Sequence, residues 1–389
     1  ADALTPLEDP HFNLELDAPV LDIGDFYAQA QGRLSLKGRL QGRRSAPTGE
    51  LHIDGRDLKA AGQAISQLGV DLNFRDQRLT LETLTLALAE DARIDGRGWV
   101  DTGGRYEMTL NSQAIPLARI AALEAQEVVA GIISFDIDGS GRLDDPGLDG
   151  DIRLTQMRLN QEPIDDGHLR LAVAGGQARL TGGLNFDLAA SYRWADQSYE
   201  AALDFDGTEL ALYLAAFGQT DLAGRLDGRI RARGDLVHPE NLSAEIDLSG
   251  VSLVYKGQPL LATQALKADF ADQTLRLSPT RLRLLEDGEL SADGQVGLDK
   301  RIDFRLNGQV PLAVARPFIG EGSDLRGRAD LQLAVTGNFE APRIDARVAL
   351  DQVGMTVPVT YQKLHRLSGE IRFDGKQVEI RDLGGQLDD

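Results

Sequence analysis

One short run of the sequence has residues of the kind that bind calcium. Asp136-Ile-Asp138-Gly139-Ser140-Gly141 begins like an EF-hand loop, in which oxygen ligands alternate along the chain. Such a loop needs a bidentate Glu at its twelfth position, and counting from Asp136 places Gly147 there. We therefore interpret Asp138-Gly139 as a hairpin turn, and give the same interpretation to Asp206-Gly207 and Asp166-Gly167.

No other group of residues in the sequence matches a catalytic motif. The sequence contains no cysteine, no Gly-x-Ser-x-Gly elbow, no Walker loop and no His-Glu-x-x-His, and none of the 61 acidic residues forms a pair that stands out by its setting. The histidines are too dispersed for a metal site: His11, His52, His168, His238 and His365. We predict a protein that is not an enzyme and that carries no metal and no cofactor; a glycan-cleaving enzyme is the most distant alternative.

Charge excludes further classes of function. The 389 residues include 41 basic and 61 acidic side chains, which gives a formal net charge of −20. This excess repels nucleic acid and anionic membrane surfaces. A hydrophobic content of 42% excludes a disordered acidic tail. No run of about 18 apolar residues could form a membrane-spanning helix.

The elements that must position any functional surface are strands. Apolar residues alternate with polar ones in many segments, such as Leu84/Leu86/Leu88 and Ile344/Ala346/Val348/Leu350. We expect type I′ hairpin turns at the recurrent Asp-Gly and Asn-Gly pairs, which tolerate positive φ. These pairs begin at Asp54, Asp95, Asp138, Asp149, Asp166, Asp206, Asp227, Asp287, Asp293, Asn307 and Asp374. The sequence predicts an all-β fold, a meandering antiparallel sheet.

A repeat of about 100 residues organises the strands. Three short helices are expected in equivalent places, at 115–124, 209–217 and 310–319, and each precedes a strand, a Gly, four residues and a Pro. The prolines of this motif are Pro47, Pro146, Pro239 and Pro342, with spacings of 99 (146 − 47), 93 (239 − 146) and 103 (342 − 239) residues. We predict drifted modules of about seven strands each, at 1–130, 131–223, 224–324 and a truncated fourth at 325–389.

One face of most strands is aliphatic. It could be the core of a closed sandwich, or the floor of a trough that stays open. Aromatic residues make up only 5%, and the aliphatic side chains are nearly uniform along the chain, which favours the trough. The aromatic run Tyr192-Arg-Trp194 with Tyr199 is interpreted as strand packing before a recognition patch. The residues predicted to line the groove are Leu34, Leu36, Leu84, Leu86, Leu169, Leu171, Leu203, Phe205, Ile246, Leu248, Ile302, Phe304, Leu331, Leu333, Ala346 and Val348.

Several motifs resemble those of the AsmA-like family. They are the Gly-x₄-Pro hairpin, the Ile115-Pro116-Leu117 segment that closes a module, and the run from Leu367 to Gly375 followed by Val378 to Gly385. The resemblance covers essentially the whole chain. It implies an elongated curled antiparallel sheet, a β-taco with an apolar groove. It also implies a bridge across the periplasm of Gram-negative bacteria, which moves phospholipid and supports assembly of outer-membrane proteins.

The same resemblance implies the partners. Phospholipid acyl chains would lie in the groove, and outer-membrane protein clients are possible partners. An inner-membrane anchor and contact with an outer-membrane assembly-factor barrel would reside in segments not present in this sequence, which we expect to be an internal piece of a longer polypeptide. Roughly 25 to 30 strands spaced about 4.8 Å apart would make a groove on the order of 120 to 140 Å long.

Two alternatives to the groove remain at this stage. In the first, the chain is a scaffold or chaperone whose open sheet edge pairs with a strand of a client protein. In the second, it is a closed sandwich or β-helix of an adhesin or surface-layer protein, with no accessible apolar cavity.

Overall fold

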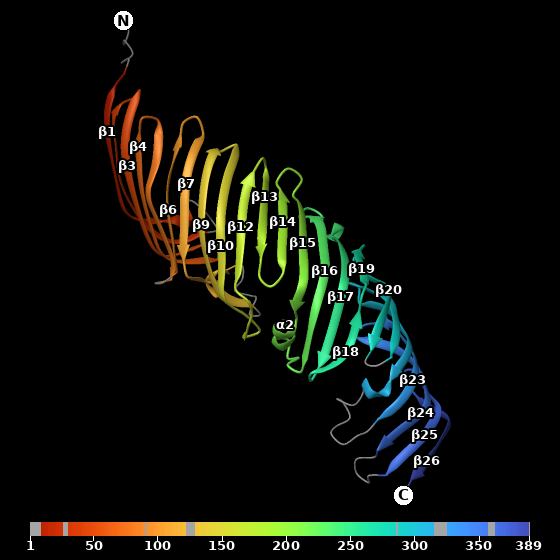
Figure 1. Ribbon diagram of the computed structural model, residues 1–389. Helices are drawn as coiled ribbons and strands as arrows, with labels where there is room; N and C mark the ends of the chain where they lie inside the picture. The colour runs from red at the N-terminus through yellow and green to blue at the C-terminus, as the bar shows by residue number, and fades with distance from the viewer. Residues whose placement is uncertain are drawn as a thin grey trace. The chain divides into compact units, whose positions relative to one another are not determined.

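The computed structural model describes residues 9–25, 30–89, 92–121, 129–284, 287–314, 325–356 and 362–388. It confirms the all-β, antiparallel prediction: 26 strands and very little helix are found (Figure 1). The residues divide into two compact units, Ala1–Leu184 with Ser191–Ala195, and Asn185–Ala190 with Asp196–Asp389. The four modules of about 100 residues stay a prediction.

Unit 1 is an antiparallel meander in which each long strand pairs with the next one along the chain. Its strands are β1 (His11–Asp22), β2 (Ala30–Arg43), β3 (Ala46–Ala60), β4 (Gln63–Arg75), β5 (Arg78–Ala89), β6 (Ala92–Asp101), β7 (Arg105–Gln113), β8 (Ile115–Pro116), β9 (Val129–Arg142), β10 (Asp145–Leu159), β11 (Glu162–Pro163), β12 (Gly167–Ala174) and β13 (Gln177–Gly183). Strand β14 (Asp187–Arg193) contributes residues to both units.

Unit 2 continues the same plan. Its strands are β15 (Ser198–Glu209), β16 (Leu222–Asp235), β17 (Ser243–Tyr255), β18 (Gln258–Thr263), β19 (Leu266–Ala271), β20 (Thr274–Leu284), β21 (Glu289–Gly297), β22 (Arg301–Pro311), β23 (Arg326–Asn338), β24 (Ala341–Thr356), β25 (Lys363–Phe373) and β26 (Val378–Asp388). In unit 2, helix α2 (Ala211–Ala216) follows β15 and the 3₁₀ turn η3 (Pro239–Asn241) follows β16; in unit 1, the 3₁₀ turns η1 (Ile23–Asp25) and η2 (Leu117–Arg119) follow β1 and β8.

The prediction that Asp-Gly pairs form the hairpin turns is wrong for most of them. Asp95-Gly96, Asp138-Gly139 and Asp206-Gly207 lie inside strands, as do the pairs that begin at Asp54, Asp149, Asp227, Asp293 and Asn307. Asp287-Gly288 and Asp374-Gly375 do lie between strands, and Asp166 directly precedes β12. Tight turns with two positive φ angles are instead made by pairs such as Asp76-Gln77, with φ of 53° and 61°. The physical reason is that the glycines are needed inside the strands, where they face bulky neighbours.

The helix predictions are corrected in two of three places. The segment 209–217 does contain α2. The segment 115–124 instead begins with strand β8 and turn η2, because Pro116 and its neighbours take extended geometry; residues 122–124 lie outside the described part. Residues 310 and 311 end β22 and a 3₁₀ turn spans 312–314, while 315–319 are likewise outside it.

The Gly-x₄-Pro motif is a recurring hairpin. It joins β2 to β3, β9 to β10, β16 to β17 and β23 to β24. In three copies another glycine, with positive φ, lies ten residues before the glycine of the motif. A buried apolar residue lies 26 residues after that first glycine (58 − 32, 157 − 131 and 353 − 327). These pairs are Gly32 with Leu58, Gly131 with Met157 and Gly327 with Val353. A side chain at the glycine would meet the buried residue, so each pair fixes a bulge at the same place.

Burial is uneven between the two ends of the strands. One end, which we call the turn rim, consists of tight turns such as 43–46 and 142–145 in unit 1, and 297–301 and 338–341 in unit 2. At the opposite end, the covered rim, apolar residues are 8% exposed or less: Ala30, Leu58, Ala87, Ala92, Ile115, Leu117 and Met157 in unit 1, and Ala216, Leu290, Ala292, Ala313, Ala329 and Val353 in unit 2. Tyr106 and Val173 are buried exceptions at the turn rim. The small core of each unit therefore lies along the covered rim.

Connecting segments account for this covered rim. After β7 the chain pairs Ile115 and Pro116 with β9 and then reaches β4, where the Gln63 side chain holds it. The Gln63 amide donates to the Arg119 carbonyl oxygen (2.8 Å), and its Oε1 accepts from the Ala121 amide (3.0 Å). In unit 2, the Tyr213 hydroxyl of α2 donates to Asn185 Oδ1 (2.6 Å).

Candidate functional site

In unit 1 the register of the strands aligns apolar side chains on one face. Directly paired residues of an antiparallel sheet point to the same side. One such row crosses the unit through Leu36, Ile53, Val70, Leu84, Gly96, Leu110, Ile137, Gly150, Leu171 and Leu180. The neighbouring row holds Leu34, Gly55, Leu68 and Leu86, and further along Ile152 and Leu169. All predicted groove residues of unit 1 therefore share one face, which we call the apolar face.

Unit 2 has an apolar face of the same construction. Its main row runs through Leu203, Ile230, Ile246, Ala268, Leu277, Gly294, Phe304, Val335 and Ile344. Leu333 with Ala346, and Leu331 with Val348, are cross-strand pairs of the same parity. Phe205, Leu248 and Ile302 lie two residues from row members on their own strands. The predicted residues of unit 2 also share one face.

Within each unit, no second sheet formed by the described strands covers the apolar face. Of the predicted residues, Leu169 and Leu248 are buried and the others are half-buried. In the described ranges no large hydrophobic side chain is less than 2% exposed. A closed sandwich core would bury many such side chains completely. Within each unit the structure therefore favours the open trough over the sandwich.

Glycines make room on this face. A Cβ atom on Gly96 would lie 2.5 Å from Leu110 Cδ2, and one on Gly150 would lie 2.9 Å from Ile137 Cγ1. On Gly55 it would lie 2.6 Å from Leu34 Cδ2. Large aliphatic side chains thus fold over glycines in the adjacent strand, which gives a smooth surface without deep holes. This is why the Asp-Gly pairs occupy strand interiors: the Asp faces the other side, where Asp95 pairs with Arg93 and Asp293 with Arg305.

A hollow of about 440 Å³ opens on the apolar face of unit 1. Its size is within the range of roughly 300 to 1,000 Å³ typical of small-ligand sites. Its apolar lining comes from β1 to β5: Leu14, Leu16, Leu40, Leu51, Leu72, Phe74 and Leu79. Leu14 and Leu16 are exposed, so the hollow is a shallow aliphatic surface rather than an enclosed cavity.

The opposite face carries ladders of charge. In unit 1 Arg153 pairs with Asp136 (3.3 Å) and His168 with Asp151 (3.0 Å). His52 lies between two carboxylates, with Nδ1 2.5 Å from Asp71 and Nε2 2.7 Å from Asp54. The hydrogen bond to Asp71 raises the pKa of His52, and the bond from Thr83 together with that from His52 lowers the pKa of Asp71. The His52 and Asp71 side chains are both about half exposed. Their ion pair therefore contributes modestly to the pairing of β3 with β4 and offers no sheltered reaction site.

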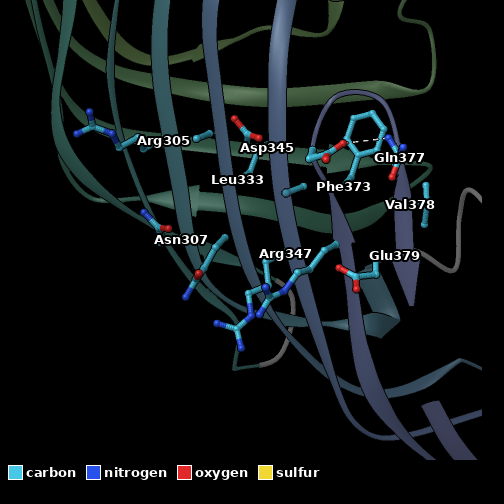
Figure 2. A pocket seen from close by; sticks show the side chains of 14 residues that line it. Arg305, Asn307, Leu333, Asp345, Arg347, Phe373, Gln377, Val378 and Glu379 are labelled. Carbon is cyan, nitrogen blue, oxygen red and sulfur yellow. Dashed lines mark hydrogen bonds between the residues drawn. The ribbon is translucent and has the colours of Figure 1, made fainter. Parts of the chain in front are cut away.

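A larger hollow of about 960 Å³ lies over β22 to β26, and Figure 2 shows charged side chains of several strands around it. Its arginines already have acidic partners. Arg372 and, to a smaller extent, Arg347 donate to Glu370 and lower the pKa of that carboxyl, and Arg305 lies 3.5 Å from Asp303. The balanced charges indicate a solvated hollow rather than an anion site.

In the part of the chain that the structure describes, no group of three or more His, Asp or Glu side chains could hold a metal ion. The same residues include no helix that is long and apolar enough to cross a membrane.

Sequence reasoning missed some members of the apolar face. Ile53, Val70, Leu110, Ile137, Leu180, Ile230, Leu277 and Val335 belong to the same rows. Their alternation with polar neighbours is a signal that could have found most of them. The bulges that shift the register, for example between Leu277 and Thr280, have no such signal.

Comparison with known proteins does not assign this chain to a family. No known family, curated protein or solved structure matches this chain, so its function has to be argued from the geometry of the apolar face.

Proposed function

We propose that this chain shelters phospholipid acyl chains along its apolar face, as a segment of a bridge that carries lipid across the periplasm between the inner and outer membranes. The observation that carries the proposal is the in-register row of half-buried aliphatic side chains in each unit. The motifs that resemble AsmA-like proteins, above all the TamB subunit of the translocation and assembly module, point to the same role.

The physical case rests on the cost of moving lipid through water. Transfer of an acyl chain into water costs about 0.8 kcal/mol per methylene, so a 16-carbon chain costs on the order of 12 kcal/mol. An aliphatic surface open along one side lowers that cost while the head group stays in water. Because the row changes little from strand to strand, an acyl chain finds no single preferred place along it, as sliding requires.

The test is native mass spectrometry with lipid extraction on the chain purified without detergent. We expect several phospholipids to stay bound to each chain. A well-folded protein that is free of lipid, and that takes none up from vesicles, would contradict the proposal.

A second candidate is a scaffold that receives a strand of an outer-membrane client protein. It is favoured by the exposed apolar side chains Val378, Ile380 and Leu383 of β26, against which a client strand could pack. Photocrosslinkers separate the two functions. Crosslinks to a polypeptide at Ile380 support the scaffold, and crosslinks to lipid at Leu84 or Phe304 support the bridge.

A further inference from the structure

The turn rim presents exposed apolar side chains at equivalent positions. The third residue of the Gly-x₄-Pro hairpin is Leu143, Leu236 and Phe339 in successive copies, with exposures of 65%, 60% and 65%. Trp194 at the turn rim of unit 1 and Leu298 at the turn rim of unit 2 are exposed as well. The first hairpin has Arg44 at this position. An apolar tip is therefore not required for the turn to form, and its presence in the later copies calls for another reason.

Backbone hydrogen bonds hold these tips in place. The amide of Leu143 donates to the carbonyl of Gly104 in the preceding turn (2.8 Å), and that of Phe339 donates to Lys300 (2.7 Å). The amides of Leu236 and Leu298 make the corresponding bonds to Gln197 (3.1 Å) and Gln273 (2.8 Å). Fixed apolar side chains in water gain nothing for the fold, whereas they lower the cost of desolvating an apolar ligand that passes over them.

The two rims differ in access to the apolar face. Buried apolar residues and the connecting segments close the strand ends at the covered rim. At the turn rim several members of the apolar face become exposed, as at Leu40 and Leu79 in unit 1 and Leu275 in unit 2, whereas Tyr106 and Val173 stay buried there. Within each unit the turn rim is therefore the side from which an acyl chain can reach the apolar face.

The charges beside the tips select a kind of head group. Arg142 and Asp144 flank Leu143 and bond to each other (2.9 Å), and Lys300 and Glu340 form an ion pair next to Phe339. These two tips thus offer a cation and an anion side by side. A head group that carries both a phosphate and an ammonium complements such a pair, whereas an anionic head group also meets the repulsion of a net charge of −20.

We propose that phospholipid loads sideways across the turn rim, and that the favoured lipid is zwitterionic. This inference rests on the proposed lipid-binding function. The matched pair of variants is Phe339→Arg and Phe217→Arg. Both residues belong to unit 2 and are almost equally exposed, at 65% and 64%, but Phe339 lies at the turn rim and Phe217 follows α2 at the covered rim. Arginine is already present at the hairpin position in the first copy, so it is compatible with the turn.

The experiment follows the rate at which the lipid-free 389-residue chain acquires lipid from vesicles. One vesicle set contains phosphatidylethanolamine and phosphatidylcholine, and the other contains phosphatidylglycerol. Leu143→Arg, Leu236→Arg and Phe339→Arg combined should slow loading roughly tenfold, a change that corresponds to about 1.4 kcal/mol in the barrier. Phe339→Arg alone should slow it more than Phe217→Arg. The amount bound at equilibrium should stay the same, and loading should be faster from the zwitterionic vesicles.

Equal loading rates for Phe339→Arg and Phe217→Arg, with normal binding at equilibrium, would overturn the sideways route and leave the lipid-binding function standing. Faster loading from phosphatidylglycerol would overturn the preference for a zwitterionic head group. Absence of lipid binding by the unchanged chain would instead refute the proposed function and, with it, this inference.

Discussion

A carboxylate placed on the apolar face should interrupt the proposed lipid path without unfolding the sheet. Leu171 is a suitable position because it lies in the main row of unit 1, between Gly150 and Leu180, and is half-buried. Strands are spaced about 4.8 Å apart, so one row position faces a stretch of about three or four methylenes. At about 0.8 kcal/mol per methylene, leaving that stretch beside a hydrated carboxylate costs about 3 kcal/mol. Leu171→Asp should therefore weaken binding of an acyl chain over this strand by about a hundredfold.

The matched control is Thr181→Asp. Thr181 lies on the neighbouring strand, points to the opposite face and pairs with Arg170, so the new charge meets a cation. In the assay each variant also carries Leu84→Cys, to which a fluorophore is attached, and is titrated with a fatty acid. The sequence has no other cysteine to compete for the label. Thermal unfolding monitored by circular dichroism shows whether the fold survives. Equal affinities for the two Asp variants, both folded, would refute the assignment of the lipid path to the apolar face.

Three further predictions concern the fold and its dependence on pH. Gln63→Ala removes both hydrogen bonds to the segment at 119–121, worth about 1 to 2 kcal/mol together, and should speed amide hydrogen exchange in that segment. Unchanged exchange would show that the Gln63 side chain does not hold the segment in place. Gly327→Ala should destabilise the chain by about 1 to 3 kcal/mol, because φ is +107° and the new Cβ would lie 2.9 Å from Val353 Cα; Gly384→Ala, with open space around it, is the control in the same denaturant titration. The raised pKa of His52 means that its stabilisation is complete below an unfolded pKa of about 6.5 and is lost as pH rises through the folded value. His52→Gln should flatten this part of the pH–stability curve, by no more than about 1 kcal/mol.

Alternation of apolar and polar residues was sufficient to predict the sheet and the face that the groove residues share. Leu84 and Leu86, or Leu331 and Leu333, define a parity that the register preserves across each unit. The reason is that a strand has a period of two, so a local pattern fixes the face independently of distant residues.

Turn and helix chemistry was harder to predict from the sequence. The Asp-Gly dipeptide satisfies a type I′ turn, but in Asp95-Gly96 the glycine instead makes room for Leu110 across the strand. That demand comes from the partner strand and is invisible in the dipeptide itself. The short helix predicted at 115–124 begins as strand because Ile115 and Pro116 pair with β9, a contact that depends on tertiary structure. The difference between the two rims also emerges only once connecting segments are placed in space.

The pairing of each long strand with its neighbour in sequence has a consequence for how the protein is made. Loop closure costs little entropy when partners are adjacent along the chain, so such a topology has low contact order and folds by adding one hairpin at a time. Each unit can therefore form progressively from its N-terminal side while the remaining chain is still emerging from a ribosome or a translocation channel. Until the next strand arrives, the growing end exposes unpaired backbone and aliphatic side chains, and protection from aggregation is needed most at that stage.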